Sequence, residues 1–186
     1  MTRPLERGEI SAAASSDLAL YGRAAHRGAA IVIREYSTSF GLASRLLSPE
    51  IRPEIENIYA LVRVADEIVD GAAAAAGLTV DQQRECLDAM EVETLRAVKR
   101  GYSSDLIVHA FARSARRAGI GPELLTPFFA SMRRDLDPSP FTAEGLREYI
   151  YGSAEVVGLM YSRSPSAVNG DGSRSRRIDA KNGVSS

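Results

Sequence analysis

The sequence has 186 residues, of which 45% are hydrophobic and 25% charged, so it is long and apolar enough to form one soluble domain. Its formal net charge of −1 argues against a nucleic-acid partner. The single cysteine, Cys86, excludes an internal disulfide and fits a cytoplasmic protein, and no segment approaches the roughly 18 consecutive apolar residues of a membrane span.

Apolar residues recur at three- and four-residue spacing along most of the chain, without the alternation typical of strands, so the sequence predicts an all-α fold. Ser48-Pro49, the capping box Thr79-x-x-Gln82 and Thr142 are expected to begin three of the helices. In chain order, we expect helices over about residues 16–36, 40–47, 49–70, 80–100, 105–118, 122–136 and 143–161.

The composition changes after Tyr161, and this change sets the expected domain boundaries. Residues 162–186 contain seven serines, three glycines and five basic residues, which is typical of a disordered tail. We therefore expect a flexible N-terminus over 1–15, one helical domain over 16–161 and a disordered tail over 162–186. A basic tail could bind an anionic surface, but a solvated chain end without a role is the preferred interpretation.

Two series of residues run along the expected helix over 49–70. Spacings of three and four place one apolar stripe on it, formed by Ile51, Ile55, Ile58, Val62, Ala65 and Val69. A second line lies roughly 100° around the helix and consists of Tyr59, Arg63, Asp66 and Asp70. The first series indicates a face buried in the core, and the second places two carboxylates side by side.

Carboxylates one helical turn apart repel each other unless a positive charge lies between them. Mg²⁺, with Mn²⁺ as the alternative ion, prefers oxygen ligands and is usually held by one or two carboxylates together with substrate phosphates. Arg63 could then bind a phosphate oxygen. The alternative is an ordinary solvated helix face on which Arg63 and Asp66 form an exposed ion pair, and periodicity alone favours this simpler interpretation.

Three ordered parts of the sequence resemble the phytoene/squalene synthase family, and bacterial phytoene synthases in particular. The first runs from Tyr36 to Leu47, with the pattern Tyr-Ser-Thr-Ser-Phe, and the second from Ile58 to Gly71, with Ala-Asp-Glu-Ile-Val-Asp. The third comprises Phe129 to Leu136 followed by Tyr149 to Met160. The resemblance implies the N-terminal part of an isoprenoid-synthase helical bundle, incomplete at its C-terminus.

The resemblance also implies roles for individual residues. Asp66 and Asp70 would bind Mg²⁺ and substrate diphosphate, Arg63 would contact the diphosphate, and all three would be catalytic. The residues that it places at the substrate are Ser37, Ser39, Phe40, Tyr59 and Tyr149. Without the resemblance, capping and turn formation explain the two serines equally well, and core packing is the preferred explanation of the three aromatic residues.

Some residues receive no chemical role at this point. Asp135 falls in a Met-x-x-Asp-Leu segment of the family and is interpreted as a helix-end residue or one that supports the site from behind. His26 and His109 lack the spacing of metal ligands and are taken as structural or exposed. Gly152, Ala154 and Gly158 are expected to let a long apolar chain or another helix come close, and helix packing alone explains them equally well.

By the resemblance, the protein would be a prenyltransferase of carotenoid and isoprenoid biosynthesis. It would join two geranylgeranyl diphosphates head to head into phytoene, through prephytoene diphosphate and with release of pyrophosphate. The family carries a second Asp-x-x-x-Asp on a later helix, and this sequence contains only the one at Asp66 and Asp70. We therefore expect a truncated chain after about residue 161, whose own activity is open.

Two alternatives stand beside this function. The chain could be a non-catalytic binding or assembly protein with the same fold, or a squalene-type synthase, although no nucleotide-binding motif supports reduction by NADPH. The expected partner is a prenyl diphosphate, with peripheral contact to a membrane made plausible by the apolar product. The oligomeric state is not assigned.

Overall fold

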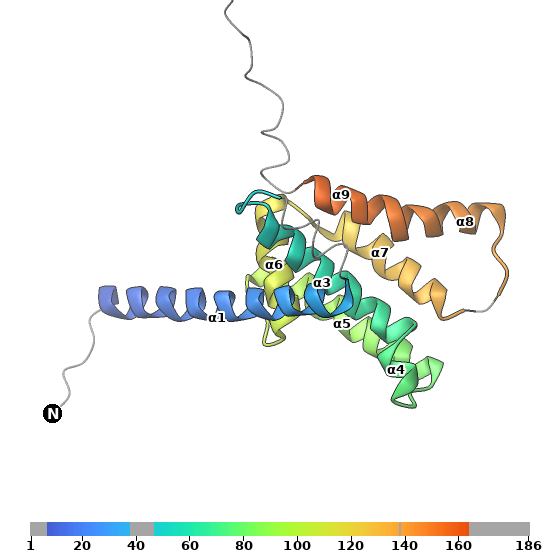
Figure 1. Ribbon diagram of the computed structural model, residues 1–186, viewed down its shortest axis with the longest axis horizontal. Helices are drawn as coiled ribbons and strands as arrows, with labels where there is room; N and C mark the ends of the chain where they lie inside the picture. Colours follow the sequence, from blue (N-terminus) through green and yellow to red (C-terminus); the bar gives the residue numbers. More distant parts are fainter. Residues whose placement is uncertain (1–6, 38–46, 138, 164–186) are drawn as a thin grey trace, which may run out of the picture.

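A computed structural model describes residues 7–37, 47–137 and 139–163, with side chains from residue 15 onward. Every element within these ranges is a helix, which confirms the all-α fold (Figure 1). The elements are α1 (Arg7–Tyr36), α3 (Arg52–Val69), α4 (Ala72–Ala75), α5 (Val80–Arg100), α6 (Leu106–Ala118), α7 (Pro122–Asp135), α8 (Ala143–Ile150), the π-helical turn η1 (Tyr151–Glu155) and α9 (Val156–Ser162). None of these helices combines the length and the apolar character needed to cross a bilayer.

The helix boundaries in the middle of the chain follow from local capping. Thr79 and Gln82 form the expected capping box at α5, in which the Gln82 N–H donates to Thr79 Oγ1 at 3.3 Å and the Thr79 N–H donates to Gln82 Oε1 at 2.9 Å. The Asp105 carboxylate accepts the first free N–H groups of α6. Gly101 and Gly119 end α5 and α6 with φ of 82° and 65°, in the left-handed region that glycine tolerates.

Three helices differ from the sequence-based expectation. Helix α1 begins at Arg7 rather than near residue 16, because the alanine-rich stretch before Asp17 continues the helix. Helix α3 begins at Arg52, not after a Ser48 cap, because Pro53 has no N–H to bond the carbonyl of Pro49. The last expected helix is interrupted by η1. Residues 40–46 of the expected helix over 40–47 and the tail beyond Arg163 lie outside the described residues.

The main core lies among α3, α5, α6, α7 and α9. Its largest fully buried side chains are aromatic: Phe111 comes from α6, and Phe128 and Phe129 pack edge to face on α7 with ring centroids 5.1 Å apart. Ile58 and Ala65 of the predicted apolar stripe on α3 are completely buried in this cluster. Burial of this apolar surface is the main force that holds α3 against α7.

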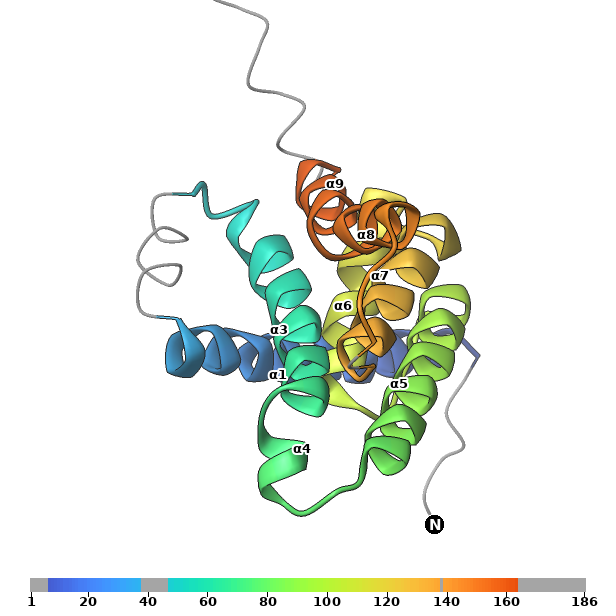
Figure 2. The same cartoon turned by 90° about the vertical axis from the view of Figure 1, so that its right-hand side faces the viewer.

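A second, smaller cluster joins α1 to α3 and α6. It consists of Ala25, Ala29, Ala60 and Ala110. Beside it, Asn57 of α3 links all three helices, because its side chain contacts His26 Nδ1 at 3.0 Å and donates to Ser114 Oγ at 2.9 Å. Helix α3 therefore lies between α1 and the group formed by α7 and α9 (Figure 2), and it packs on both.

His109 is a completely buried side chain at the start of α6. Its ring lies 4.8 Å from that of Tyr21 and 5.6 Å from that of Tyr102, and Nδ1 accepts the Ser103 N–H at 3.3 Å. Nε2 finds no hydrogen-bond partner among the described residues. Burial, followed by the charge of Arg113, lowers the pKa of His109. The structural role expected for this histidine agrees with these contacts.

This burial predicts a pH-dependent loss of stability. Because the pKa of His109 is lower in the folded than in the unfolded protein, its contribution is complete above the unfolded value of about 6.5 and is lost as the pH falls below it. In urea denaturation between pH 7.5 and 5, the parent should lose free energy of unfolding relative to His109→Phe, by at most about 1.4 kcal/mol per pH unit. Parallel pH profiles for the two proteins would contradict this assignment.

Candidate functional site

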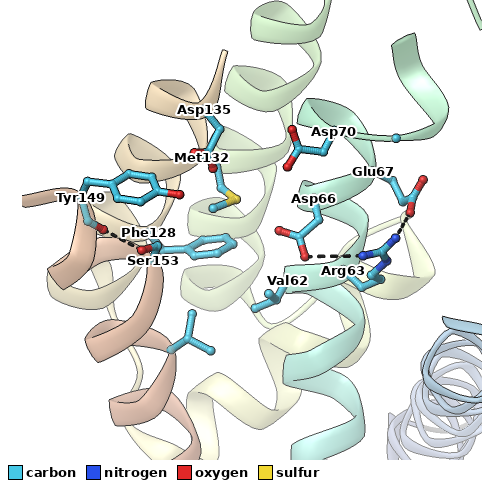
Figure 3. A pocket seen from close by; sticks show the side chains of 12 residues that line it. Val62, Arg63, Asp66, Glu67, Asp70, Phe128, Met132, Asp135, Tyr149 and Ser153 are labelled. Carbon is cyan, nitrogen blue, oxygen red and sulfur yellow. Dashed lines mark hydrogen bonds and ion pairs between the residues drawn. The ribbon is translucent and has the colours of Figure 1, made fainter. Parts of the chain in front are cut away.

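A cavity of about 360 Å³ lies between α3 and the helices α7, α8, η1 and α9 (Figure 3). One wall is the charged face of α3, with Arg63, Asp66, Glu67 and Asp70. The opposite side carries Asp135 at the end of α7, Tyr149 on α8 and Ser153 on η1. Apolar side chains also line the cavity: Val62, Phe128, Met132 and Val157. The cavity is therefore polar on two facing walls and has apolar surface available to a ligand.

The charged wall is organised by Glu67. This carboxylate forms the close ion pair with Arg63 and also accepts the Ala72 N–H at 2.9 Å, so it connects α3 to the start of α4. The Arg63 guanidinium lies 4.5 Å from the centroid of the Tyr36 ring and 4.0 Å from Asp66 Oδ2. The strong partner of Arg63 is thus Glu67, and the ion pair with Asp66 weighed in the sequence analysis is a long, weak one.

Burial and neighbouring negative charge raise the pKa of two carboxylates of the cavity. The pKa of Asp66 is raised to about 6, chiefly by burial and in addition by the negative charges of Asp70 and Asp135, against the opposing effect of Arg63. Burial is also the main cause that raises the pKa of Asp135, with Asp70 adding to it. These groups face the cavity with more negative charge than Arg63 balances, which favours a positively charged ligand.

The opposite wall brings Asp135 and Tyr149 together at the cavity. The neighbouring Asp135 carboxylate, followed by burial, raises the pKa of Tyr149. The Tyr149 ring lies 5.0 Å from that of Phe141, centroid to centroid. Ser153 Oγ donates to the Tyr149 carbonyl at 2.8 Å. In Figure 3 the tyrosine hydroxyl points inward, toward the side of the cavity that holds Asp135.

The carboxylate oxygens on α3 suit a hard divalent cation that takes only a few of its ligands from the protein. Asp66 and Asp70 offer carboxylate oxygens from adjacent turns of α3, which is the kind of ligand that Mg²⁺ prefers. Among the described residues, no three His, Cys, Asp or Glu side chains are grouped closely enough to hold a metal ion by themselves. An ion at this wall would therefore take its remaining ligands from water or from a bound phosphate, as Mg²⁺ commonly does.

Four of the residues singled out from the sequence meet in this cavity: Arg63, Asp66, Asp70 and Tyr149. Ser37 follows the end of α1, where its N–H donates to the Ile33 carbonyl at 3.0 Å, and it is not among the described residues that line the cavity. Tyr59 is likewise outside the lining and lies near Tyr161, whose pKa is raised by burial and by Tyr59. Ser39 and Phe40 lie outside the described residues.

Sequence reasoning missed the contribution of α7. Asp135 was interpreted as a helix-end or supporting residue, but it lines the cavity opposite Asp70. Phe128, Met132 and Asp135 follow spacings of four and three and so share one face of α7, a pattern that indicates a lining stripe ending in a carboxylate. The position of Ser153 depends on the π-helical turn, for which the sequence offers no comparable signal.

The model of the squalene/phytoene synthase family matches residues 33–176, and the chain belongs to this family. The match extends over both segments that form the cavity walls, from α3 to α9.

Individual relatives agree with this assignment. The chain is 31% identical to phytoene synthase 3, chloroplastic, of Zea mays over 69% of its own length and 29% of the relative's. It is 28% identical to a 15-cis-phytoene synthase of Paracoccus sp. over 70% of its length and 44% of the relative's. A dehydrosqualene synthase crystal structure shares the fold, with a TM-score of 0.63 at 23% identity over 75% of this chain and 47% of that one. The chain thus spans less than half of each of these relatives.

Proposed function

We propose that the cavity binds a prenyl diphosphate together with Mg²⁺, as part of a phytoene-synthase-type prenyltransferase. The observation that carries the proposal is the meeting of Arg63, Asp66 and Asp70 on one wall of a cavity that also has apolar lining. A volume of about 360 Å³ falls within the usual range of small-molecule sites. Family membership and similarity to phytoene synthases support the same substrate class.

Different side chains of the cavity would bind different parts of the ligand. Arg63, held in place by Glu67, would direct its guanidinium donors to the diphosphate oxygens. Val62, Phe128 and Val157 would contact the isoprenoid chain and exclude water from it. Asp66 and Asp70 would hold Mg²⁺, with Mn²⁺ as the alternative ion. The metal would supply Lewis-acid stabilisation of the departing diphosphate.

The proposed reaction is head-to-head coupling of two geranylgeranyl diphosphates to phytoene through prephytoene diphosphate, with two molecules of pyrophosphate released. A second candidate is a protein that binds prenyl diphosphate without turnover. The two candidates share the binding site and differ only in chemistry.

Calorimetric titration of the whole chain with geranylgeranyl diphosphate tests the common part of both candidates. We expect binding that depends on Mg²⁺ and disappears with EDTA, because the carboxylates of α3 repel a diphosphate without an intervening cation. Geranylgeraniol, which lacks the diphosphate, is the matched control ligand and should show no Mg²⁺ dependence. Absence of Mg²⁺-dependent binding to the folded chain would overturn the proposal, and chromatographic detection of phytoene separates the enzyme from the binding protein.

A further inference from the structure

Arg63 is held from two sides at the candidate site, and one of the two contacts comes from outside the cavity. Its guanidinium lies over the ring of Tyr36, with Cζ 4.5 Å from the ring centroid, while Nη2 donates to Glu67 Oε1. Tyr36 is the last residue of α1 and is not among the described residues that line the cavity. The proposed function therefore gives Tyr36 no task, although it contacts the arginine that would bind the diphosphate.

The end of α1 is fixed relative to α3, and this gives the Tyr36 ring a defined position. Ile33, one turn before Tyr36, is 1% exposed, and the smaller alanine cluster joins α1 to α3. The Tyr36 ring itself is 50% exposed, so core packing does not account for its placement. The face of an aromatic ring attracts a guanidinium. Tyr36 thus presents a ring face to Arg63 from a separate, well-anchored helix.

The position of Arg63 decides which charges remain available to a ligand. Arg63 Nη1 lies 4.0 Å from Asp66 Oδ2, beyond hydrogen-bonding distance, and a small rotation of the guanidinium would turn this contact into a close ion pair. Such a pair would neutralise a carboxylate proposed to bind Mg²⁺ and would occupy a donor proposed for the diphosphate. The contacts with Tyr36 and Glu67 oppose this rotation and leave Nη1 on the side of Asp66 (Figure 3).

We infer that Tyr36 is a positioning residue that, together with Glu67, holds the Arg63 guanidinium so that Nη1 is available to a diphosphate oxygen beside Asp66. This inference rests on the proposed function, because it concerns the same arginine and the same ligand class. Tyr36 acts through Arg63, and it does so with its ring face and not with its hydroxyl. Phenylalanine should therefore replace Tyr36 without loss, whereas leucine should not.

The contact itself is tested by NMR on the whole chain labelled with ¹⁵N-arginine. Arg63→Lys identifies the Arg63 Nε–H resonance by its disappearance. In Tyr36→Leu this resonance should move downfield, because the shielding by the aromatic ring is lost, and in Tyr36→Phe it should stay near its parent position. Arg134, whose Cζ lies 4.1 Å from the centroid of the Phe141 ring, is the internal control and should not respond. An unmoved Arg63 resonance in Tyr36→Leu would overturn the inference.

Binding of inorganic pyrophosphate in the presence of MgCl₂ tests whether Tyr36 acts through Arg63. The affinity should fall about threefold in Tyr36→Leu, the size expected of a cation–π contact, and should equal that of the parent in Tyr36→Phe. In an Arg63→Met background, Tyr36→Leu should cause no further loss. A loss in Tyr36→Phe, or an undiminished effect of Tyr36→Leu in the Arg63→Met background, would overturn the inference. If the parent bound no Mg²⁺-pyrophosphate, the proposed function would fail, while the NMR measurement would still decide whether Tyr36 holds Arg63.

Discussion

Replacing Gly152 with alanine is expected to destabilise the protein by about 1–3 kcal/mol, the typical effect of forcing an extra methyl group into a packed interior. Gly152 is buried in η1, and a Cβ atom there would lie 2.3 Å from the Pro127 carbonyl oxygen and 2.9 Å from Ser131 Cβ. The first of these atoms is backbone, so it cannot turn aside as a flexible side chain would. The substitution must push η1 away from α7.

Gly158 on α9 provides the matched control for Gly152. A Cβ atom at Gly158 would meet nothing within 4 Å among the described residues, so Gly158→Ala should raise the free energy of unfolding by roughly 0.5–1 kcal/mol through helix propensity. Urea denaturation of both variants gives the comparison. Equal stability of the two variants would show that the close contact between η1 and α7 does not hold in solution. The sequence left two interpretations of Gly152, namely room for an apolar ligand chain and close packing of helices. The structure shows contact between η1 and α7 at Gly152, which agrees with close packing.

Asp66→Asn is expected to weaken Mg²⁺-dependent diphosphate binding at least tenfold and, at the same time, to stabilise the fold. Binding should fall because an amide is a poorer ligand for a hard cation than a carboxylate. Stability should rise because the folded protein holds a carboxylate whose pKa of about 6 shows that its charge is disfavoured there. We expect a gain of roughly 1 kcal/mol, less than the full pKa shift implies, since 36% of the side chain is exposed to solvent.

The sign of the pH dependence makes this prediction specific. Because the pKa of Asp66 is higher in the folded protein than its unfolded value of about 3.9, stability declines as the pH rises from about 4 to 6. The advantage of Asp66→Asn should therefore be complete above pH 6 and vanish near pH 4. Glu85→Gln, an exposed change on α5, controls for the loss of one negative charge. Lower stability of Asp66→Asn at pH 7.5 would contradict the prediction.

Local sequence signals predicted much of the fold. The capping box of Thr79 and the glycines after α5 and α6 act within a few residues, so their outcome hardly depends on the rest of the chain. Two other features depend on interactions that these signals do not contain. The start of α3 was misplaced because the missing N–H of Pro53 outweighs the capping preference of Ser48. The π-helical turn faces the backbone of α7, a partner some 25 positions away in the chain.

The candidate site was likewise predicted only where its residues share one helix. Arg63, Asp66 and Asp70 share one helix, so their spacing alone places them on one wall. Asp135 and Tyr149 come from two different helices, so their meeting at the cavity could not be derived from periodicity within either one. The choice of Glu67 over Asp66 as the main partner of Arg63 likewise depends on the turn into α4, where the Ala72 N–H fixes the carboxylate.

Helices α3 and α8, which line opposite sides of the cavity, should unfold locally with different free energies. Helix α3 packs on two sides, against the main core and, through the smaller alanine cluster, against α1 and α6. Helix α8, in contrast, buries no residue. Amide protons of α3 should accordingly exchange with solvent only through large-scale unfolding, and those of α8 through small local openings. A ligand would then enter by displacement of α8, which bears Tyr149, while the carboxylates that receive it stay in place.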